Sequence, residues 1–380
     1  MRLLFLTGSR GEWGYIRPIL ERCKKEKIHF DICATNMHLL KSYGQTEKEI
    51  ENDGFKISDR IYMALDGYNH FTMAKSMGIF MSSFTDTINR IRPTWLIIAG
   101  DRAETFMASI VASYTYTPVA HIQAGELSGS IDGMARHAIG KLSHIHFAAN
   151  KDAATRLKKL GEEDFRIKLV GAPQLDDLKN IDQNNILLKK IFLKQGVSYL
   201  KNYILVVYHP VTNEFDLIEQ KFRALESSLK EIAFPKIWIM PNNDAGSDTL
   251  KDLIVDAADN NIYFFDNLPR QDYLHLLKHC KLLIGNSSSG IIESTFFKIP
   301  VINLGSRQNS RVRAKNVLDV KIENKKNIIK AYKKCLSKKF INSLKKVRSL
   351  YGDGESSKRI LDILKKININ SKILSKNLTY

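Results

Sequence analysis

Acidic, basic and histidine side chains are concentrated between residues 101 and 137 of this 380-residue chain. They follow two short apolar runs, residues 95–99 and 118–122, which have the composition of buried parallel strands. In open α/β sheets, ligands bind beyond the carboxyl ends of the strands. We therefore expect one site at these strand ends, able to exchange protons and to bind anions, with side chains from Asp101, Arg102, Glu104, His121, Glu126, Asp132, Arg136 and His137.

A second polar cluster, the run GNSSSG at residues 285–290, follows another apolar run. A strand followed by small hydroxyl residues and the start of a helix favours anions, because backbone N–H groups and the helix dipole both attract negative charge. One helix cap needs one such residue, whereas four stand here in a row, so we favour phosphate binding over simple capping. Glu293 comes about two turns later, at a distance suited to a ribose diol.

Three further apolar runs in the second half lead into polar loops. These loops carry His209, Asn242 and Arg307, after residues 203–208, 236–240 and 300–303. Arginine suits bidentate contact with phosphate. The chain has neither a GxGxxG motif nor a P-loop lysine, which argues against dinucleotides and nucleoside triphosphates as ligands.

Strand and helix patterns alternate along both halves of the chain, which predicts βαβ units and parallel sheets. The length exceeds that of a usual single core, and a break at residues 171–173 precedes a polar segment. We predict an α/β protein of two doubly wound, Rossmann-like domains. Residues 1–175 carry the acid/base residues, and residues 176–380 bind the anion and end in a helix, residues 356–367, that can pack back on the first domain. The expected strands are residues 3–6, 29–35, 56–63, 95–99, 118–122, 144–149, 166–170, 203–208, 236–240, 262–265, 281–284 and 300–303.

Composition restricts the class of protein further. No apolar run reaches the ~18 residues that span a bilayer, and the first apolar run is too short for a signal peptide. The four cysteines form no CxxC pair, so neither a disulfide framework nor a zinc site is indicated. We expect a cytoplasmic protein. The net charge of +18 comes largely from lysines of the last sixty residues, which alternate with Ile and Leu at helical spacing. This pattern is typical of solvated helix faces and not of a nucleic-acid or membrane surface; an anionic substrate is the second interpretation.

Taken together, these motifs resemble those of the hydrolysing UDP-sugar 2-epimerases, the sialic-acid and legionaminic-acid pathway relatives of UDP-N-acetylglucosamine 2-epimerase. The resemblance covers nearly the whole chain. The matching motifs, in the order of the family, are TGSR at 7–10, GDR at 100–102, HIQAGE at 121–126, SGSID at 128–132, RH at 136–137, HPVT at 209–212, DAGS at 244–247, GNSS at 285–288 and GSRQ at 305–308.

The resemblance implies a glycosyltransferase-B-like fold with UDP in the interdomain cleft, and a two-step reaction. UDP leaves by elimination across C1–C2, and water then adds to the 2-acetamidoglycal to give the free manno-configured sugar. Asp101 and Asp132 would be the acid/base carboxylates, with Glu126 as a further catalytic candidate. The candidate substrate-binding residues are Arg10, Arg102, Gln123, Arg136, His137, His209, Asn242, Ser287, Ser288, Gly290, Glu293 and Arg307.

Gln123 departs from the family pattern, in which many relatives carry a catalytic glutamate. Glutamine cannot exchange a proton at neutral pH. Either Glu126 takes that role, or Gln123 orients the sugar and the chemistry depends on Asp101 and Asp132. The sequence HIQAGE at this motif resembles the motif of the family branch that acts on 2,4-diacetamido-2,4,6-trideoxy sugars. It is less similar to the motif of the branch that uses UDP-N-acetylglucosamine.

Three alternatives remain: a UDP-sugar glycosyltransferase of the same fold, a non-hydrolysing epimerase, and a nucleotide-binding regulatory protein without catalysis. The acids near Asp101 and Asp132 favour elimination over simple transfer, and residues 128–132 follow the hydrolysing pattern. No hydride moves in the implied reaction, so we expect no nicotinamide or other cofactor, and the pattern requires no metal. The expected partner is a UDP-sugar, without nucleic acid or membrane, and the resemblance implies a homodimer.

Overall fold

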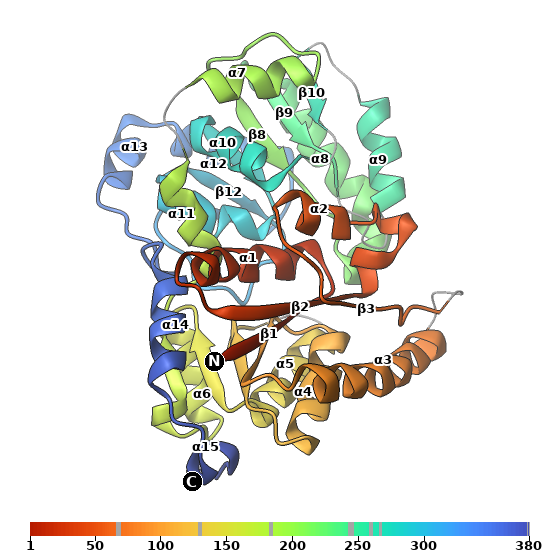
Figure 1. Cartoon of the computed structure of the whole chain (residues 1–380). Helices are drawn as coiled ribbons and strands as arrows, with labels where there is room; N and C mark the ends of the chain where they lie inside the picture. Colours follow the sequence, from red (N-terminus) through yellow and green to blue (C-terminus); the bar gives the residue numbers. More distant parts are fainter. Residues whose placement is uncertain are drawn as a thin grey trace. The chain divides into compact units, whose positions relative to one another are not determined.

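The computed structural model describes residues 1–65, 70–127, 131–181, 185–241, 247–257, 261–265, 268–377 and 379. Contacts divide the chain into two compact units (Figure 1). Unit 1 consists of Met1–Asp177 and Tyr351–Tyr380, and unit 2 of Leu178–Leu350. The C-terminal segment therefore belongs to the same compact unit as the N-terminal half of the chain.

Unit 1 is built on a seven-stranded parallel sheet with the strand order β3-β2-β1-β4-β5-β6-β7. The strands are β1 (Arg2–Thr7), β2 (His29–Thr35), β3 (Asp59–Ile61), β4 (Trp95–Ala99), β5 (Val119–Ile122), β6 (Ile145–Ala148) and β7 (Ile167–Leu169). The strand order reverses between β1 and β4, as in a doubly wound sheet. Such sheets bind ligands at this switch point, beyond the carboxyl ends of the strands.

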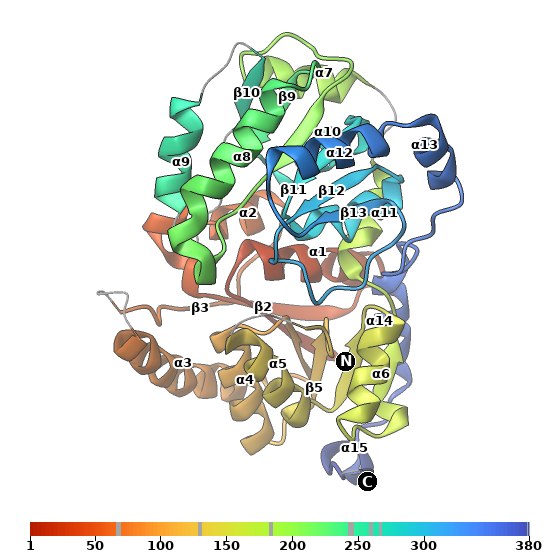
Figure 2. The same ribbon diagram turned by 180° about the vertical axis from the view of Figure 1, so that it is seen from behind.

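Helices cover both faces of this sheet (Figures 1 and 2). They are α1 (Arg10–Lys25), α2 (Glu47–Asn52), α3 (His70–Ile91), α4 (Ala103–Tyr114), α5 (Ile131–Leu142), α6 (Lys151–Lys159), α14 (Ser356–Lys366) and α15 (Ser371–Leu374). Alternate residues of β1 point to opposite faces: Leu3 and Phe5 pack with α1 and α14, and Leu4 and Leu6 with α3 and α4. Apolar residues on both faces of the central strands β1 and β4 explain why these two strands read as continuous apolar runs.

Unit 2 contains a six-stranded parallel sheet with the order β10-β9-β8-β11-β12-β13. The strands are β8 (Ile204–Val207), β9 (Lys236–Ile239), β10 (Ile262–Phe265), β11 (Leu282–Gly285), β12 (Val301–Leu304) and β13 (Val317–Val320). The predicted class, two doubly wound α/β domains, is confirmed. Sequence patterns missed β13, because this edge strand buries only its first and last residues and gives no apolar run.

The helices of unit 2 are α7 (Asn185–Lys194), α8 (Ile218–Lys230), α9 (Ser247–Asp256), α10 (Arg270–His279), α11 (Glu293–Phe297), α12 (Lys325–Cys335) and α13 (Lys338–Leu344). Apolar residues of α8, α9 and α12 share one core with the sheet, for example Phe222, Ile254 and Ile328. On α7, the Phe192 ring packs edge-on against Phe265, with ring centroids 5.8 Å apart.

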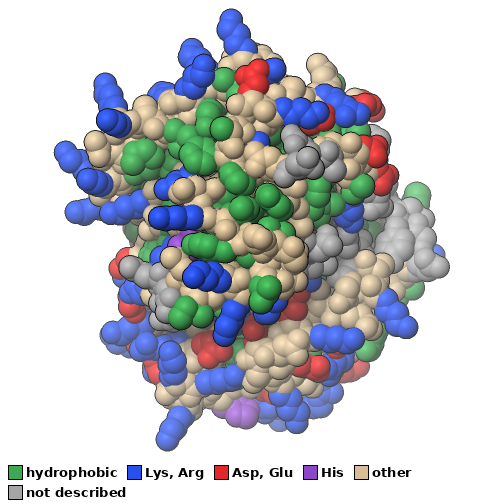
Figure 3. Space-filling view, turned by 90° about the horizontal axis from the view of Figure 1, so that it is seen from above, with side chains coloured by type: hydrophobic (Ala, Val, Ile, Leu, Met, Phe, Trp, Pro, Cys, Tyr) green, Lys and Arg blue, Asp and Glu red, His purple; other side chains and the backbone are tan. Residues whose placement is uncertain are grey.

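The lysines of α12 lie on a solvated helix face, as predicted. On α12, Ile328, Ala331 and Cys335 are buried, while Lys325, Lys326, Lys333 and Lys334 are exposed. Figure 3 shows Lys and Arg side chains scattered over the visible face, with Asp and Glu side chains among them. None of the helices in the described part of the chain is long and apolar enough to cross a membrane.

Candidate active site

In unit 1, the turn after β4 is fixed by a buried histidine of β5. The Nε2 of His121 lies 2.7 Å from the carbonyl oxygen of Gly100, and because a carbonyl can only accept, Nε2 carries the proton. Burial lowers the pKa of His121 to about 3, so the ring is neutral. Gly100 has a φ of +80°, which glycine adopts without strain. This contact positions the backbone directly before Asp101.

Arg136 of α5 connects the ends of β4 and β5. Its Nη2 donates to the Oδ2 of Asp101, and its Nη1 donates to the carbonyl oxygen of Gln123 at 2.7 Å. The guanidinium is buried, and the carboxylate of Asp101 is 17 % exposed. The structure thus brings together three of the residues expected from the sequence: a partly open carboxylate, the buried cation that orients it, and Gln123.

Gln123 has an unusual backbone and a buried side chain. Its φ is +62°, a left-handed conformation that non-glycine residues seldom adopt. Its Nε2 donates to the Oε1 of Gln174 at 3.2 Å. An amide held by another amide suits a residue that orients its surroundings. Sequence reasoning did not single out Gln174, which lies 51 residues further along the chain.

Glu126 contacts the start of α6. Its Oε1 accepts a hydrogen bond of 2.5 Å from the Nδ2 of Asn150, whose Oδ1 in turn caps α6 through the N–H of Ala153. The preceding Gly125 has a φ of +75°, and a Cβ there would lie 2.5 Å from the carbonyl oxygen of Ala153. Glu126 is therefore bound to a helix cap, which gives it a structural contact beside its candidate catalytic role.

Further predicted residues of unit 1 lie in α5 or directly before α4. Asp132 is the second residue of α5, but its side chain and residues 128–130 lie outside the described part of the structure. His137 is half-buried, and burial together with the charges of Arg136 and Arg156 lowers its pKa. Arg102 precedes α4, and its Nε donates to the Oε1 of Glu104 at 3.2 Å.

Arg10, the first residue of α1, forms an ion pair of 2.5 Å with Glu49. Its side chain is 46 % exposed. An exposed guanidinium can exchange a carboxylate partner for a phosphate at little cost, because surface ion pairs are weak.

In unit 2, Asn286 joins three strand ends. Its Oδ1 accepts from the backbone N–H of His209 at 2.8 Å, and its Nδ2 donates to the carbonyl oxygen of His209 at 2.7 Å. Its own carbonyl oxygen accepts from Arg307 Nη1 at 3.3 Å and from Gln308 Nε2 at 3.0 Å. The loops after β8, β11 and β12 thus meet at one buried amide. Asn286 lies in the GNSS motif but is not among the site residues predicted from the sequence.

The expected helix after GNSSSG is shorter than predicted. A 3-10 turn at Ser288–Gly290 follows Ser287, and α11 has only five residues, with Glu293 as its first. Glu293 therefore does not lie two turns into a helix, and the local dipole is small. The side chains of Ser287 and Ser288 are half-buried, and the Ser287 Oγ lies 3.0 Å from that of Ser289.

The remaining predicted residues of unit 2 differ in their surroundings. Burial and the charge of Arg307 lower the pKa of His209 to about 3, so its imidazole is neutral. Arg307 is exposed. Glu293 is buried and accepts from the Nη2 of Arg270 at 3.3 Å. Gly290 is buried against Leu283 and Val301. Asn242 lies outside the described residues.

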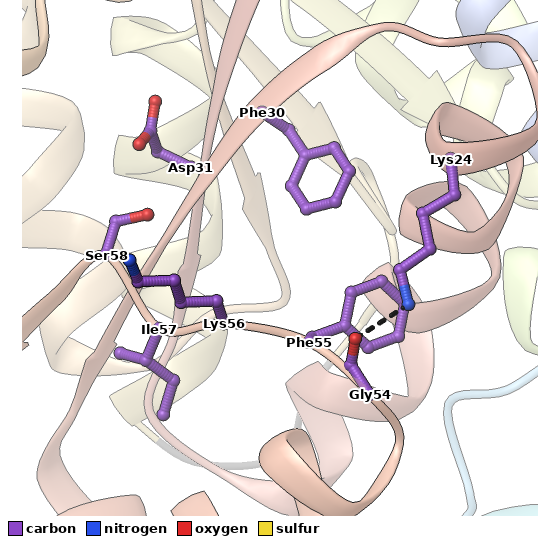
Figure 4. Close-up of a pocket in the computed structure, with 8 residues that line it drawn as sticks. All are labelled: Lys24, Phe30, Asp31, Gly54, Phe55, Lys56, Ile57 and Ser58. Atoms are coloured by element: carbon purple, nitrogen blue, oxygen red, sulfur yellow. Dashed lines mark hydrogen bonds between the residues drawn. The ribbon is translucent and has the colours of Figure 1, made fainter.

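A cavity of about 430 Å³ in unit 1 lies away from these strand ends (Figure 4). Phe30 and Asp31 line it from the beginning of β2, and residues 54–58 line it from the segment before β3. The Nζ of Lys24 closes one side, where it donates to the carbonyl oxygen of Gly54 at 2.9 Å. Because this cavity lies at the amino ends of the strands, we do not include it in the candidate site. Within the described ranges, no cluster of three or more His, Cys, Asp or Glu side chains could hold a metal ion.

The two parallel sheets, each with polar side chains at its carboxyl edge, define a glycosyltransferase-B-like α/β protein. Residues 21–365 match the UDP-N-acetylglucosamine 2-epimerase family, so the chain belongs to that family.

Similar proteins come from several bacteria. The UDP-N,N'-diacetylbacillosamine 2-epimerase (hydrolyzing) of Legionella pneumophila is 36% identical, over 99% of this chain and 98% of that protein. The UDP-N-acetylglucosamine 2-epimerase of Neisseria meningitidis serogroup B is 33% identical over 88% of each chain. A crystal structure of UDP-GlcNAc 2-epimerase from Neisseria meningitidis bound to UDP-GlcNAc superposes with a TM-score of 0.83 at 19% identity, over 97% of this chain and 100% of that chain. At this identity the superposition shows a common fold.

Proposed function

We propose that this chain is a hydrolysing UDP-sugar 2-epimerase that converts a UDP-2-acetamido sugar and water into the free manno-configured 2-epimer and UDP. In the first step, a base removes the C2 proton, the C1–O bond to UDP breaks, and a C1–C2 double bond forms. In the second step, water adds its hydroxyl to C1 and a proton returns to C2 on the opposite face. The full-length similarity to a relative whose name includes "hydrolyzing" supports this reaction.

The observation that carries the proposal is the pairing of Asp101 with Arg136 next to Gln123. A carboxylate fixed by a buried guanidinium can remove a weakly acidic proton, because its orientation is set before the substrate binds. We assign the proton transfers to Asp101 and Asp132 and an orienting role to Gln123. The contact of Glu126 with Asn150 favours a structural role for Glu126.

We assign UDP binding mainly to unit 2. The hydroxyls of Ser287 and Ser288 and the guanidinium of Arg307 would bind phosphate oxygens, which accept strong hydrogen bonds from such donors. His209 is neutral and therefore suits a hydrogen bond better than a charge contact. Asn242 and Glu293 complete the proposed nucleotide set. The cations Arg10 and Arg102 and the imidazole of His137, all in unit 1, are assigned to the leaving diphosphate and the sugar.

As substrate we propose the UDP-2,4-diacetamido-2,4,6-trideoxy sugar over UDP-N-acetylglucosamine, which places the reaction in nonulosonic acid biosynthesis. The higher identity and longer alignment with the Legionella protein than with the Neisseria protein support this order. A homodimer and a cytoplasmic location complete the proposal. Light scattering of the purified protein tests the dimer.

Proton NMR in D2O with both candidate UDP-sugars tests the proposal. We expect free sugar and UDP to appear together, with deuterium at C2 of the product. Free sugar that keeps its C2 hydrogen and configuration would contradict the elimination and favour a glycosyltransferase. A product still joined to UDP would point to a non-hydrolysing epimerase. A Gln123→Glu variant tests the substrate assignment, because a gain on UDP-N-acetylglucosamine would link Gln123 to the substrate class.

A further inference from the structure

Two buried carboxyl groups, Glu12 of α1 and Glu104 of α4, meet beside Gly8 in unit 1. The backbone N–H of Gly8 donates to the Oε2 of Glu12 at 2.5 Å, and a Cβ on Gly8 would overlap the Oε1 of Glu104. Glu12 is 4 % exposed and Glu104 is fully buried. The two helices follow β1 and β4, between which the strand order reverses. The protein's own acids therefore occupy a place where open α/β sheets commonly hold an anion.

Acids in the first turn of a helix are common, since they compensate the positive end of the dipole. Helix capping alone does not account for this pair, because both carboxyl groups are buried and Glu12 also contacts a second helix. Here the side chains cross between helices: Glu12 of α1 contacts the hydroxyl of Thr105 in α4 at 2.9 Å. The pair is part of the interior of unit 1.

The charges around the pair do not balance if both acids are ionised. Arg102 forms an ion pair with Glu104, and its positive charge also favours the ionised form of Glu12. Arg10 lies at the start of α1, in an ion pair with Glu49. His38 is neutral at physiological pH, because burial lowers its pKa to about 4. Burial, followed by the charge of Glu104, raises the pKa of Glu12 to about 8. Two ionised carboxylates at such a site would be costly, and a proton on one of them removes that cost.

The hydrogen-bond partners indicate which acid holds the proton. The oxygens of Glu104 face the Nε of Arg102 at 3.2 Å and the Nδ2 of Asn36 at 3.0 Å. Both of these groups can only donate, so Glu104 must accept. The Oε1 of Glu12 faces the Thr105 hydroxyl, which can accept as well as donate and which has the carbonyl oxygen of Ala99 at 3.5 Å as another acceptor. A proton on Glu12 therefore fits without loss of a contact.

We propose that Glu12 and Glu104 form a carboxyl pair that holds a single proton. Glu12 carries this proton, and the ionised Glu104 carboxylate positions Arg102 for the substrate. Glu104 is thus a positioning residue, which reaches the substrate only through Arg102. This inference depends on the proposed function for the role of Arg102. The proton on the pair is a property of unit 1 alone and can be tested without any substrate.

Thermal unfolding between pH 6 and 9.5 tests the proton. A carboxyl with a raised folded-state pKa stabilises the fold at low pH, and this contribution is lost as the pH rises through about 8. Lys376 also titrates in this range, since burial lowers its pKa to about 8. The informative quantity is therefore the difference in Tm between the wild type and Glu12→Gln, because Lys376 is present in both proteins. We expect the Tm of Glu12→Gln to increase relative to the Tm of the wild type as the pH rises. Parallel profiles would show that Glu12 does not hold the proton.

Steady-state kinetics test the positioning role. Glu104→Gln should raise KM for the UDP-sugar at least tenfold with a change in kcat below threefold, because Arg102 loses its anionic partner. Glu104→Asp, which keeps the charge, should restore part of the loss. Glu21→Gln, on the same helix as Glu12, is the matched control. An unchanged KM for a folded Glu104→Gln would overturn the positioning role. If no UDP-sugar is turned over, the proposed function fails, while the unfolding experiment still decides the proton on the pair.

Discussion

The side chain of Asn286 forms two hydrogen bonds with the backbone of His209, one to its N–H at 2.8 Å and one to its carbonyl oxygen at 2.7 Å. An amide can satisfy both groups because it carries a donor and an acceptor. The backbone carbonyl of the same residue contacts Arg307. One asparagine therefore fixes the loops that carry two proposed UDP-binding residues.

Asn286→Asp should weaken UDP binding about tenfold or more. The new carboxylate keeps the acceptor for the His209 N–H but has no donor for the His209 carbonyl, and a hydrogen bond lost in a buried place costs about 1–3 kcal/mol. It also places a negative charge beside the proposed phosphate site. Titration calorimetry with UDP measures the effect. Asn342→Asp, at an exposed position of α13, is the control and should bind UDP like the wild type. Equal affinity of Asn286→Asp would show that Asn286 does not support the UDP site.

Asp101→Asn should reduce kcat by ~10²-fold or more while UDP affinity stays within about twofold, since a positioned acid or base contributes factors of this size. The isosteric amide keeps an acceptor for Arg136 but cannot take a proton. Single-turnover kinetics and UDP titration measure the two quantities separately. Asp86→Asn, on the exposed side of α3, serves as the control. Near wild-type turnover of Asp101→Asn would exclude Asp101 as the base.

Burial explains which parts of the fold the sequence predicted. The runs at β2, β4 and β10 were identified with their observed bounds, because each is rich in apolar residues. Of the three, β4 is buried throughout, as expected for a parallel strand covered on both faces, whereas β2 and β10 bury only part of their residues. The edge strand β13 has no such run and was missed. The residue types of the site could likewise be predicted from the polar segments that follow the apolar runs, because the loops at the carboxyl ends of parallel strands lie on the same side of the sheet.

The contacts that hold the site together could not be read from the sequence. Arg136 meets Asp101 across 35 residues, and Asn286 meets His209 across 77. Local propensity does not encode such pairings, because they depend on how neighbouring strands align. The role of Glu12 was hidden for the same reason: its position in the first turn of α1 reads as an ordinary helix cap until Glu104 is brought beside it.

Gly285→Ala should destabilise unit 2 by more than ~3 kcal/mol or prevent its folding. Gly285 has a φ of +148°, and a Cβ there would overlap the carbonyl oxygen of Val207 on the neighbouring strand β8. Backbone atoms of a central strand cannot move aside cheaply. Gly140→Ala is the matched control, because Gly140 lies in α5 with nothing within 4 Å of its Cβ position, and alanine there should add about 0.5–1 kcal/mol. Chemical denaturation compares the two, and equal stabilities would show that β8 and β11 do not pair this closely.

The buried carboxylate of Glu162 connects the C-terminal segment to α5 and β6 through three contacts. It accepts from His146 at 2.8 Å, from Lys376 at 2.7 Å and from Lys141 at 3.0 Å, and its side chain is 3 % exposed. Lys376 also donates to the carbonyl oxygens of Gly140 and Ser143 at the end of α5, the helix that carries Arg136. This network therefore holds both the chain end and a helix of the proposed site.

Glu162→Gln should cost ~3–5 kcal/mol at pH 7, because it leaves the largely buried ammonium of Lys376 without its anion. Burial alone would raise the pKa of Glu162, but the hydrogen bond from His146 and the charge of Lys376 lower it to about 2. A lowered carboxyl pKa stabilises the fold above the ordinary value near 4.5, and this contribution is lost as the pH falls toward 2. In urea unfolding at pH 7, 4.5 and 3, the difference in unfolding free energy between wild type and variant should therefore decrease as the pH falls. Asp164→Asn, which breaks the exposed pair with Lys158, should change little at any of these values. A pH-independent difference would mean that packing, and not the charge of Glu162, holds the C-terminal segment in place.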